Sequence, residues 1–253
     1  MSDVPNGKKP DLDRVWAALL GQGYALTSEH EIGLPDNFRD YFLKTYFTDD
    51  YIRHDPGDWP QDRKRARDVI RYQWDGEDLH LAEHDTIALT DRAGIPGKRE
   101  HSRVMLLDDR QAKDFVRAIL KLVPPDRRKP TGTFGVNLFR TFTDVVTKPH
   151  HDDEELIILY VLQRKGEGAE TYLYDLPSEG ESIGGPILRR QLNPGEIIIF
   201  DDARFLHGAT PLKALPDGAA MRDVLVCTID SPDSYLRKPN SGQSAAVPVG
   251  SRG

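Results

Sequence analysis

The stretch PHHDDEELIILYVLQRK, residues 149–165, joins a cluster of potential metal ligands to one of the most apolar runs of the chain. The apolar run, residues 156–162, has the length and the branched and aromatic side chains of a buried strand. The six residues before it are two histidines, two aspartates and two glutamates, which a core strand would not accommodate. The sequence therefore predicts a core strand that begins directly behind a polar site.

Runs of the same kind occur on both sides of this stretch. After Pro130 the chain contains eight short β-rich runs separated by Gly, Pro, Asn and Asp: residues 133–142, 144–150, 155–164, 170–176, 186–192, 196–202, 204–212 and 222–230. No helical pattern lies between them, and successive strands without intervening helices favour an antiparallel arrangement. We expect residues 130–230 to form a jelly roll, also called a double-stranded β-helix.

The first 129 residues have a different pattern, with apolar side chains at helical spacing. This spacing predicts helices within residues 11–23, 34–47 and 108–126. Gly21 is expected to end the first helix and the Pro124–Pro125 pair to end the third. Residues 50–105 are expected to contain strands with long loops. The expected fold class is therefore mainly β with N-terminal helices (α+β).

The length of the chain, 253 residues, is sufficient for one domain with a full core. We expect a single domain over residues 1–236, in which a helical and mixed part (1–129) supports the jelly-roll core (130–230). Residues 237–253 contain little to bury and are expected to form a flexible tail.

The composition excludes several classes of protein. A net charge of −7 argues against general binding to nucleic acid or to anionic membranes. The single cysteine, Cys227, excludes an internal disulfide framework and a cysteine-rich metal site, and its place in VLVCTI predicts a buried structural thiol. The N-terminus lacks an apolar signal region and no run reaches membrane-spanning length, so we expect a cytoplasmic protein.

The polar cluster contains two overlapping His-x-Asp pairs. Residues i and i+2 of a strand face the same side, so His150 would point with Asp152, and His151 with Asp153. Either pair would supply two of the three ligands of a 2-His-1-carboxylate site for non-haem Fe(II). The alternative is a solvated turn between two strands.

Two later residues extend this pattern. His207, the only histidine after residue 151, follows the apolar strand 196–200. Arg222 opens the apolar run VLVCTI, and an arginine at the entrance of a core strand needs an anionic partner. A dicarboxylate cosubstrate would provide one, because the guanidinium group matches a carboxylate. The alternative partner is Asp223 or another acidic residue.

The order of these residues resembles the Fe(II)/2-oxoglutarate-dependent dioxygenases, and within them the bacterial L-isoleucine dioxygenase type, which hydroxylates free aliphatic amino acids. The resemblance rests on HHDDEELIILYVL, FDDARFLHGATPL and RDVLVCTI, and it extends weakly to RARDVIRY (65–72). It covers about residues 130–230. EGAE (167–170) replaces the Gly-Gly pair that is usual in this group, a departure that touches only a turn.

The resemblance implies ligands, cosubstrate and reaction. It implies that Fe(II) is bound by His150, Asp152 and His207, and that Arg222 anchors the far carboxylate of 2-oxoglutarate. Alignment on Asp-Asp-Glu favours His150 over His151, although the second pair has the same spacing. The implied reaction consumes O2 and 2-oxoglutarate, releases succinate and CO2, and hydroxylates an unactivated C–H bond.

The implied substrate is the side chain of a free L-amino acid or a close derivative. Arg65, Arg67 and Arg71 share one face in alternation and are candidates to hold its carboxylate, as is Arg140 in VNLFRTF. A charged, solvated edge strand is the alternative for the first three. The acidic cluster could bind an ammonium group, so a polar or basic amino acid competes with an aliphatic one.

Two other functions fit a jelly roll. A cupin-type metalloenzyme that works without 2-oxoglutarate would give no reason for Arg222. A non-catalytic binding protein would not need three intact ligands, and a peptide hydroxylase stays open. The expected partner is a small molecule, with no nucleic acid and no membrane, and a homodimer stays open.

Overall fold

The computed structural model describes residues 12–54, 63–84, 103–142, 147–152, 154–180 and 182–229. Its helices are α1 (Asp13–Gln22), α2 (Phe38–Tyr46) and α3 (Arg110–Leu120). Its strands are β1 (Tyr24–Ser28), β2 (Arg53–His54), β3 (Lys64–Asp75), β4 (Asp78–Glu83), β5 (Thr131–Thr141), β6 (Thr147–His150), β7 (Leu156–Lys165), β8 (Glu167–Gly168), β9 (Thr171–Asp175), β10 (Leu188–Arg190), β11 (Glu196–Asp201), β12 (Phe205–Ala209), β13 (Leu212–Lys213) and β14 (Met221–Ile229). The predicted tail, residues 237–253, lies outside the described residues.

Most strands form two antiparallel sheets that pack face to face, and β8 and β13 pair in a small third sheet. The larger sheet has the order β1-β11-β7-β14-β5-β3-β2, with β4 paired to β3, and the smaller has the order β10-β9-β12-β6. Their facing sides share one core, in which Ile198 and Val224 of the larger sheet pack with Leu173 and Phe205 of the smaller. All eight runs predicted after Pro130 contain a strand. The predicted fold class, a jelly roll preceded by helices, is confirmed.

The N-terminal part contributes strands to the larger sheet as well as helices. Strand β3 pairs with β5 over ten residue pairs, from Lys64–Arg140 to Gln73–Thr131. Strand β1, which the sequence pattern did not predict, pairs with β11. The larger sheet therefore extends beyond residues 130–230, and β3 brings its arginines to the edge of the jelly roll.

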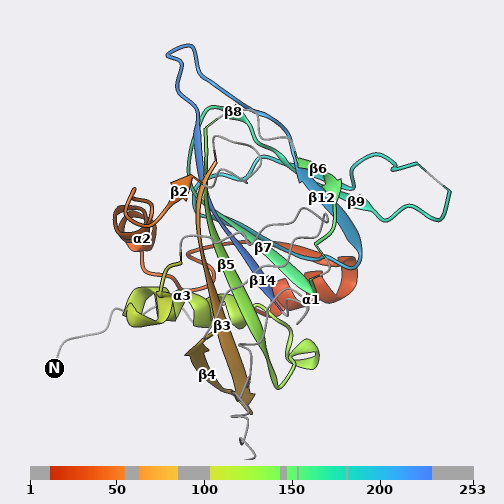
Figure 1. The fold of residues 1–253 in the computed structure, drawn as a ribbon. Helices are drawn as coiled ribbons and strands as arrows, with labels where there is room; N and C mark the ends of the chain where they lie inside the picture. Colours follow the sequence, from red (N-terminus) through yellow and green to blue (C-terminus); the bar gives the residue numbers. More distant parts are fainter. Residues whose placement is uncertain are drawn as a thin grey trace, which may run out of the picture.

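The larger sheet is buried on both faces. Along β7, Leu156, Ile158 and Tyr160 pack against the side covered by the helices, whereas Ile157 and Val161 pack toward the smaller sheet. In Figure 1, helices α2 and α3 lie on one side of β3 and β5, and strands β6, β9 and β12 lie on the other side. Burial on both faces explains the continuous apolar run at residues 156–162, since an alternating pattern would be expected only for a half-exposed strand.

The buried faces also account for the helices and the cysteine. Helix α1 continues through Gly21 and ends at Gly23, which adopts φ 83° and donates its N–H to Leu19 O. Gly21 was therefore the wrong stop, because the left-handed cap lies two residues later. Cys227 is fully buried on the helix-covered side, and burial raises the pKa of its thiol, in keeping with a structural role.

Among the described residues, no helix is long and apolar enough to cross a membrane.

Candidate metal centre

Three candidate ligands meet at the end of the smaller sheet. Strands β6 and β12 are antiparallel neighbours, and their register places His207 directly opposite His150. Asp152 follows β6 by two residues, so its carboxylate returns to the same side as His150. The pairing of β6 with β12 therefore joins sequence positions more than fifty residues apart into one site.

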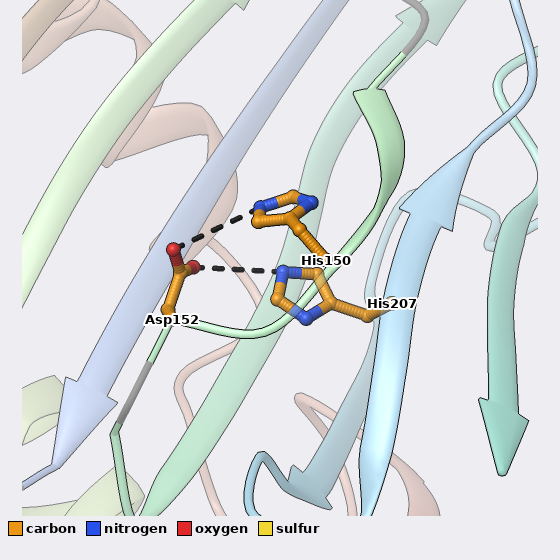
Figure 2. A group of neighbouring side chains, drawn as sticks. All are labelled: His150, Asp152 and His207. Atoms are coloured by element: carbon orange, nitrogen blue, oxygen red, sulfur yellow. Dashed lines mark ion pairs between the residues drawn. The ribbon is translucent and has the colours of Figure 1, made fainter. Parts of the chain in front are cut away.

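The ligand atoms of these residues face a common point (Figure 2). Oδ1 of Asp152 lies 3.8 Å from His150 Nε2, and Oδ2 of Asp152 lies 3.5 Å from His207 Nε2. One ligand atom from each residue lies within 4.8 Å of the others. A metal ion bound at ~2.1 Å to each ligand would hold neighbouring ligand atoms ~3 Å apart. Small side-chain rotations would therefore close these atoms around an ion.

In each histidine, the contact that Nδ1 makes determines whether Nε2 is available to bind a metal. His150 Nδ1 lies 2.8 Å from Lys148 O, and a carbonyl only accepts, so Nδ1 carries the proton and Nε2 is left as a ligand. His207 Nδ1 lies 3.3 Å from Asp202 Oδ1. Burial disfavours protonated His207, but Asp152 and Asp202 outweigh this effect and raise its pKa to about 9. The surroundings of His207 thus favour a positive charge, as a metal-binding site requires.

The set of donors fits Fe(II). Two imidazoles and one carboxylate on one side of a point are the facial triad of non-haem Fe(II) oxygenases, which leaves the other coordination positions open. Within the described part of the chain, His150, Asp152 and His207 are the only such group. His151 is exposed and does not join it, and Asp153 lies outside the described residues. The geometry therefore brings together the first of the two predicted pairs.

A cavity of about 340 Å³ opens beside this triad. It lies between the two sheets, and residues of both line it. Its apolar walls include Phe139, Leu159, Val224 and Val226, and its polar lining includes Arg222 together with the triad. The cavity thus connects the candidate metal site with the arginine that was predicted to bind a cosubstrate.

Arg222 and Asp223 point to opposite faces of β14, so the simplest alternative partner of Arg222 is absent. Asp223 is paired with Arg140 on the helix-covered side, whereas Arg222 lines the cavity. Nε and Nη2 of Arg222 are buried and have no hydrogen-bond partner among the described residues. Burial, and secondarily the nearby charge of Arg164, lowers the pKa of Arg222 to about 10, so the side chain stays protonated at neutral pH. Such a cation fits an anionic ligand in the cavity, because two of its donors are buried and have no partner in the part of the chain that the structure describes.

The three predicted arginines of β3 share one face, but their surroundings differ. Arg65 and Arg67 are opposite Phe139 and Asn137 of β5, whose side chains face the cavity side of the sheet. The pKa of Arg67 is lowered by burial and raised less by Glu154 and Asp152, which places Arg67 near the triad. Arg71 lies further along the strand and is exposed.

One further arginine that was not predicted as a site residue, Arg63, lines the cavity itself. Its guanidinium lies 4.5 Å from the centre of the Phe139 ring.

Arg140 occupies the opposite face of β5 from the cavity. Its Nε and Nη2 each lie 2.7 Å from a carboxylate oxygen of Asp223, which is fully buried. The hydrogen bond to Asp223 raises the pKa of Arg140 despite burial. This placement gives Arg140 a structural partner and no access to the cavity, because consecutive residues of a strand face opposite sides.

Replacing Arg140 with methionine should therefore destabilise the protein without weakening substrate binding. The change leaves the buried Asp223 carboxylate without its cation, and breaking a buried pair in this way costs about 3 kcal/mol or more. Chemical unfolding would measure the stability, and substrate titration would measure the affinity. A large loss of substrate affinity in a folded Arg140→Met protein would contradict this structural role.

Besides Arg63, two more residues near the site were missed by the sequence pattern. Asp202 follows the apolar strand 196–200 in the pair Asp201–Asp202, and nothing in the sequence separates its role from that of Asp201. Arg164 is brought beside Arg222 by a register shift between β14 and β7 at Asp223/Val224. This shift places Gln163 at Asp223 and turns Arg164 toward the cavity side, which regular alternation would not have predicted.

Comparison with known proteins gives the same class as the site. The family model described as 2OG-Fe dioxygenase matches residues 49–228. The chain therefore belongs to the 2OG-Fe dioxygenase family, whose members use Fe(II), 2-oxoglutarate and O2. No curated protein sequence matches the chain.

Solved structures share the fold at low sequence identity. A bsmA homologue from Methylobium petroleophilum PM1 has a TM-score of 0.73 and 18% identity, covering 91% of this chain and 97% of its own. IDO from Bacillus thuringiensis has a TM-score of 0.64 and 16% identity, covering 94% and 100%. The Fe(II)/α-ketoglutarate-dependent dioxygenase TqaL has a TM-score of 0.66 and 13% identity, covering 88% and 87%. These likenesses cover nearly the whole chain and concern the fold alone.

Proposed function

We propose that the protein hydroxylates the side chain of a free L-amino acid or a close derivative, with 2-oxoglutarate and O2 consumed and succinate and CO2 released. The observation that carries this proposal is the cavity of about 340 Å³, which joins the triad to Arg222, whose Nε and Nη2 have no hydrogen-bond partner among the described residues. This volume is near the lower end of the ~300–1,000 Å³ of small-molecule sites. With 2-oxoglutarate in place, the remaining space favours a small substrate.

The residues of the site have separate roles in this reaction. His150, Asp152 and His207 would hold Fe(II), which supplies the oxidising chemistry together with 2-oxoglutarate and O2 when bound. Arg222 would bind the far carboxylate of 2-oxoglutarate and so orient the cosubstrate in the cavity. The apolar walls, which include Leu159, Val224 and Val226, would exclude water from the reacting C–H bond.

The charges beside the triad support a zwitterionic substrate. Arg67 interacts electrostatically with Glu154 and with the ligand Asp152, so charges of both signs influence the region of the metal site. An amino acid presents a carboxylate and an ammonium group, which match a guanidinium and a carboxylate respectively. This arrangement supports a free amino acid over a substrate without charges.

A matched set of substrates tests the proposal. The twenty free L-amino acids would be supplied with Fe(II), 2-oxoglutarate and O2, and succinate release would be compared with a product that has gained one oxygen atom. Any amino acid that reacts would then be supplied with its amine acetylated or its carboxylate amidated. We expect both blocked forms to react much more slowly. Turnover of peptides alone would show that the protein is a peptide hydroxylase instead.

Replacing Arg67 with alanine should weaken binding of the amino acid more than binding of 2-oxoglutarate. Loss of a charge-assisted contact to a carboxylate costs ~1.5–3 kcal/mol, so the apparent KM for the substrate should rise about tenfold or more. Steady-state kinetics with each substrate varied in turn would measure the two effects.

Arg71→Ala is the matched control for Arg67→Ala. Arg71 lies on the same face of β3, but it is exposed and distant from the triad, so its removal should leave both KM values unchanged. An unchanged substrate KM in folded Arg67→Ala, and also in Arg65→Ala, would remove these residues from the carboxylate site.

A further inference from the structure

Asp202 is a fully buried carboxylate that contacts two of the three candidate ligands. Its Oδ2 accepts hydrogen bonds from the backbone N–H of Asp152 at 2.7 Å and of Glu154 at 3.0 Å. Its Oδ1 lies 3.3 Å from His207 Nδ1. One side chain thus connects the segment that holds Asp152 with the imidazole of His207.

The group that lies closest to a counter-charge for this buried carboxylate, within the described part of the chain, is the His207 imidazole. Among the described residues, no lysine or arginine lies within ion-pair distance of Asp202, and His207 is its sole such partner. Oδ1 of Asp202 and Nδ1 of His207 are both buried, and among the described residues neither has a hydrogen-bond partner, although the two atoms face each other at 3.3 Å. Burying a carboxylate without a compensating group costs free energy, and the imidazole of His207 is the group that offsets this cost for Asp202.

The orientation of His207 agrees with this contact. Figure 2 shows one ring nitrogen of His207 directed at Asp152 and the other directed away from it. The nitrogen directed away is Nδ1, since Nε2 is the atom that faces Asp152. A carboxylate is an acceptor only, so a proton on Nδ1 satisfies Asp202 and leaves the lone pair of Nε2 for a metal.

We propose that Asp202 is a positioning residue of the metal centre, which fixes His207 in the Nδ1–H tautomer and holds the backbone of Asp152 in register with it. The proposal rests on the metal site described above and extends it beyond the three ligands. Partners of this kind orient ligands, and their loss typically costs about tenfold to a hundredfold in metal affinity. A residue that served only to stabilise the fold would have no such effect.

The substitution Asp202→Asn separates these two roles. The amide oxygen would turn toward the two backbone N–H groups and keep the segment in place, because the NH2 group cannot accept from them. The NH2 group would then face His207 Nδ1, which would have to accept, so the ring proton would move to Nε2 and block the ligand atom. We expect Asp202→Asn to fold normally and to bind Co(II) about tenfold to a hundredfold more weakly than the parent protein.

The matched control is Asp201→Asn. Asp201 is the preceding residue, the last of β11, and is largely buried, but its carboxylate binds Arg127 at 3.0 Å and contacts none of the three candidate metal ligands. Its replacement should leave Co(II) affinity unchanged. Titration of each protein with Co(II) alone, without 2-oxoglutarate or substrate, would give the dissociation constants, and circular dichroism would verify folding.

The outcomes distinguish this proposal from the proposed function. A parent protein that binds no Co(II) would contradict the metal site itself. A parent protein that binds, together with an Asp202→Asn protein of equal affinity, would overturn only the role of Asp202. If Asp202→Asn did not fold, nitrogen-15 NMR of the Zn(II)-loaded parent would decide: a proton on His207 Nδ1 is expected, and a proton on Nε2 would overturn the proposal.

Discussion

Each of the substitutions His150→Ala, Asp152→Ala and His207→Ala should reduce turnover coupled to succinate release below detection. The His151→Ala protein should keep substantial activity. Loss of a partner outside the ligands already costs about tenfold to a hundredfold, so loss of a ligand should cost more than a hundredfold. His151 is exposed and lies outside the triad. Product formation and Fe(II) content, measured on the same preparations, would check both statements.

His151→Ala also serves as the control for this series, because it removes a neighbouring imidazole without changing the triad. An inactive His151→Ala protein together with an active His150→Ala protein would show that the second His-x-Asp pair binds the metal. That outcome would place Asp153 rather than Asp152 in the site.

Replacing Arg222 should weaken binding of 2-oxoglutarate while Fe(II) stays bound. Truncating one partner of a buried, hydrogen-bonded charge pair costs ~2–5 kcal/mol, so Arg222→Ala should raise the dissociation constant of 2-oxoglutarate roughly a hundredfold. Arg222→Lys keeps the charge but loses the planar pair of donors, and its effect should be smaller. Anaerobic titration with 2-oxoglutarate in the presence of Fe(II), followed by visible absorbance, would measure both constants.

A shorter 2-oxoacid gives the control for this effect. Such a compound lacks the far carboxylate, so Arg222→Ala should lose much less affinity for it than for 2-oxoglutarate. An equal loss for both compounds would mean that Arg222 acts on the site as a whole and does not bind that carboxylate.

The stability of the same variants separates a ligand-binding arginine from a structural one. Arg222 has buried donors without partners, so Arg222→Met should not lower the free energy of unfolding measured without 2-oxoglutarate. Arg140→Met should lower it by about 3 kcal/mol, because Arg140 holds the buried Asp223. Equal destabilisation by the two changes would contradict the separate roles given to these two residues.

Much of the fold could be predicted because its signals are local. The apolar runs after Pro130 gave the strands, and the stripe of α3 gave its helix. The pairing of β1 with β11 could not be predicted, because Tyr24–Ser28 is short and finds its partner about 170 residues later. Which strands become neighbours is decided by the packing of the whole sheet and not by any one segment.

In the candidate site, too, the residues with a local sequence signal could be predicted, and those whose role depends on contacts between strands could not. His150, Asp152 and His207 carry distinctive chemistry at a distinctive spacing, so the sequence brought them to attention. Arg140 was a candidate to hold the substrate carboxylate, but its side chain lies on the face of β5 opposite the cavity, because strand alternation depends on a register that the sequence does not state. Asp202 and Arg164 had no signal of their own, since their importance arises from contacts across strands.

We expect His150, Asp152 and His207 to hold one Fe(II), to which 2-oxoglutarate binds with Arg222 as the anchor of its far carboxylate. The most direct measurement is the visible absorbance of the protein with Fe(II) and 2-oxoglutarate under anaerobic conditions. We predict a weak charge-transfer band that saturates at one 2-oxoglutarate per chain, requires His207 and needs more 2-oxoglutarate in Arg222→Ala. Absence of the band in the parent protein, or an equal band in His207→Ala, would show that these residues do not form such an iron site.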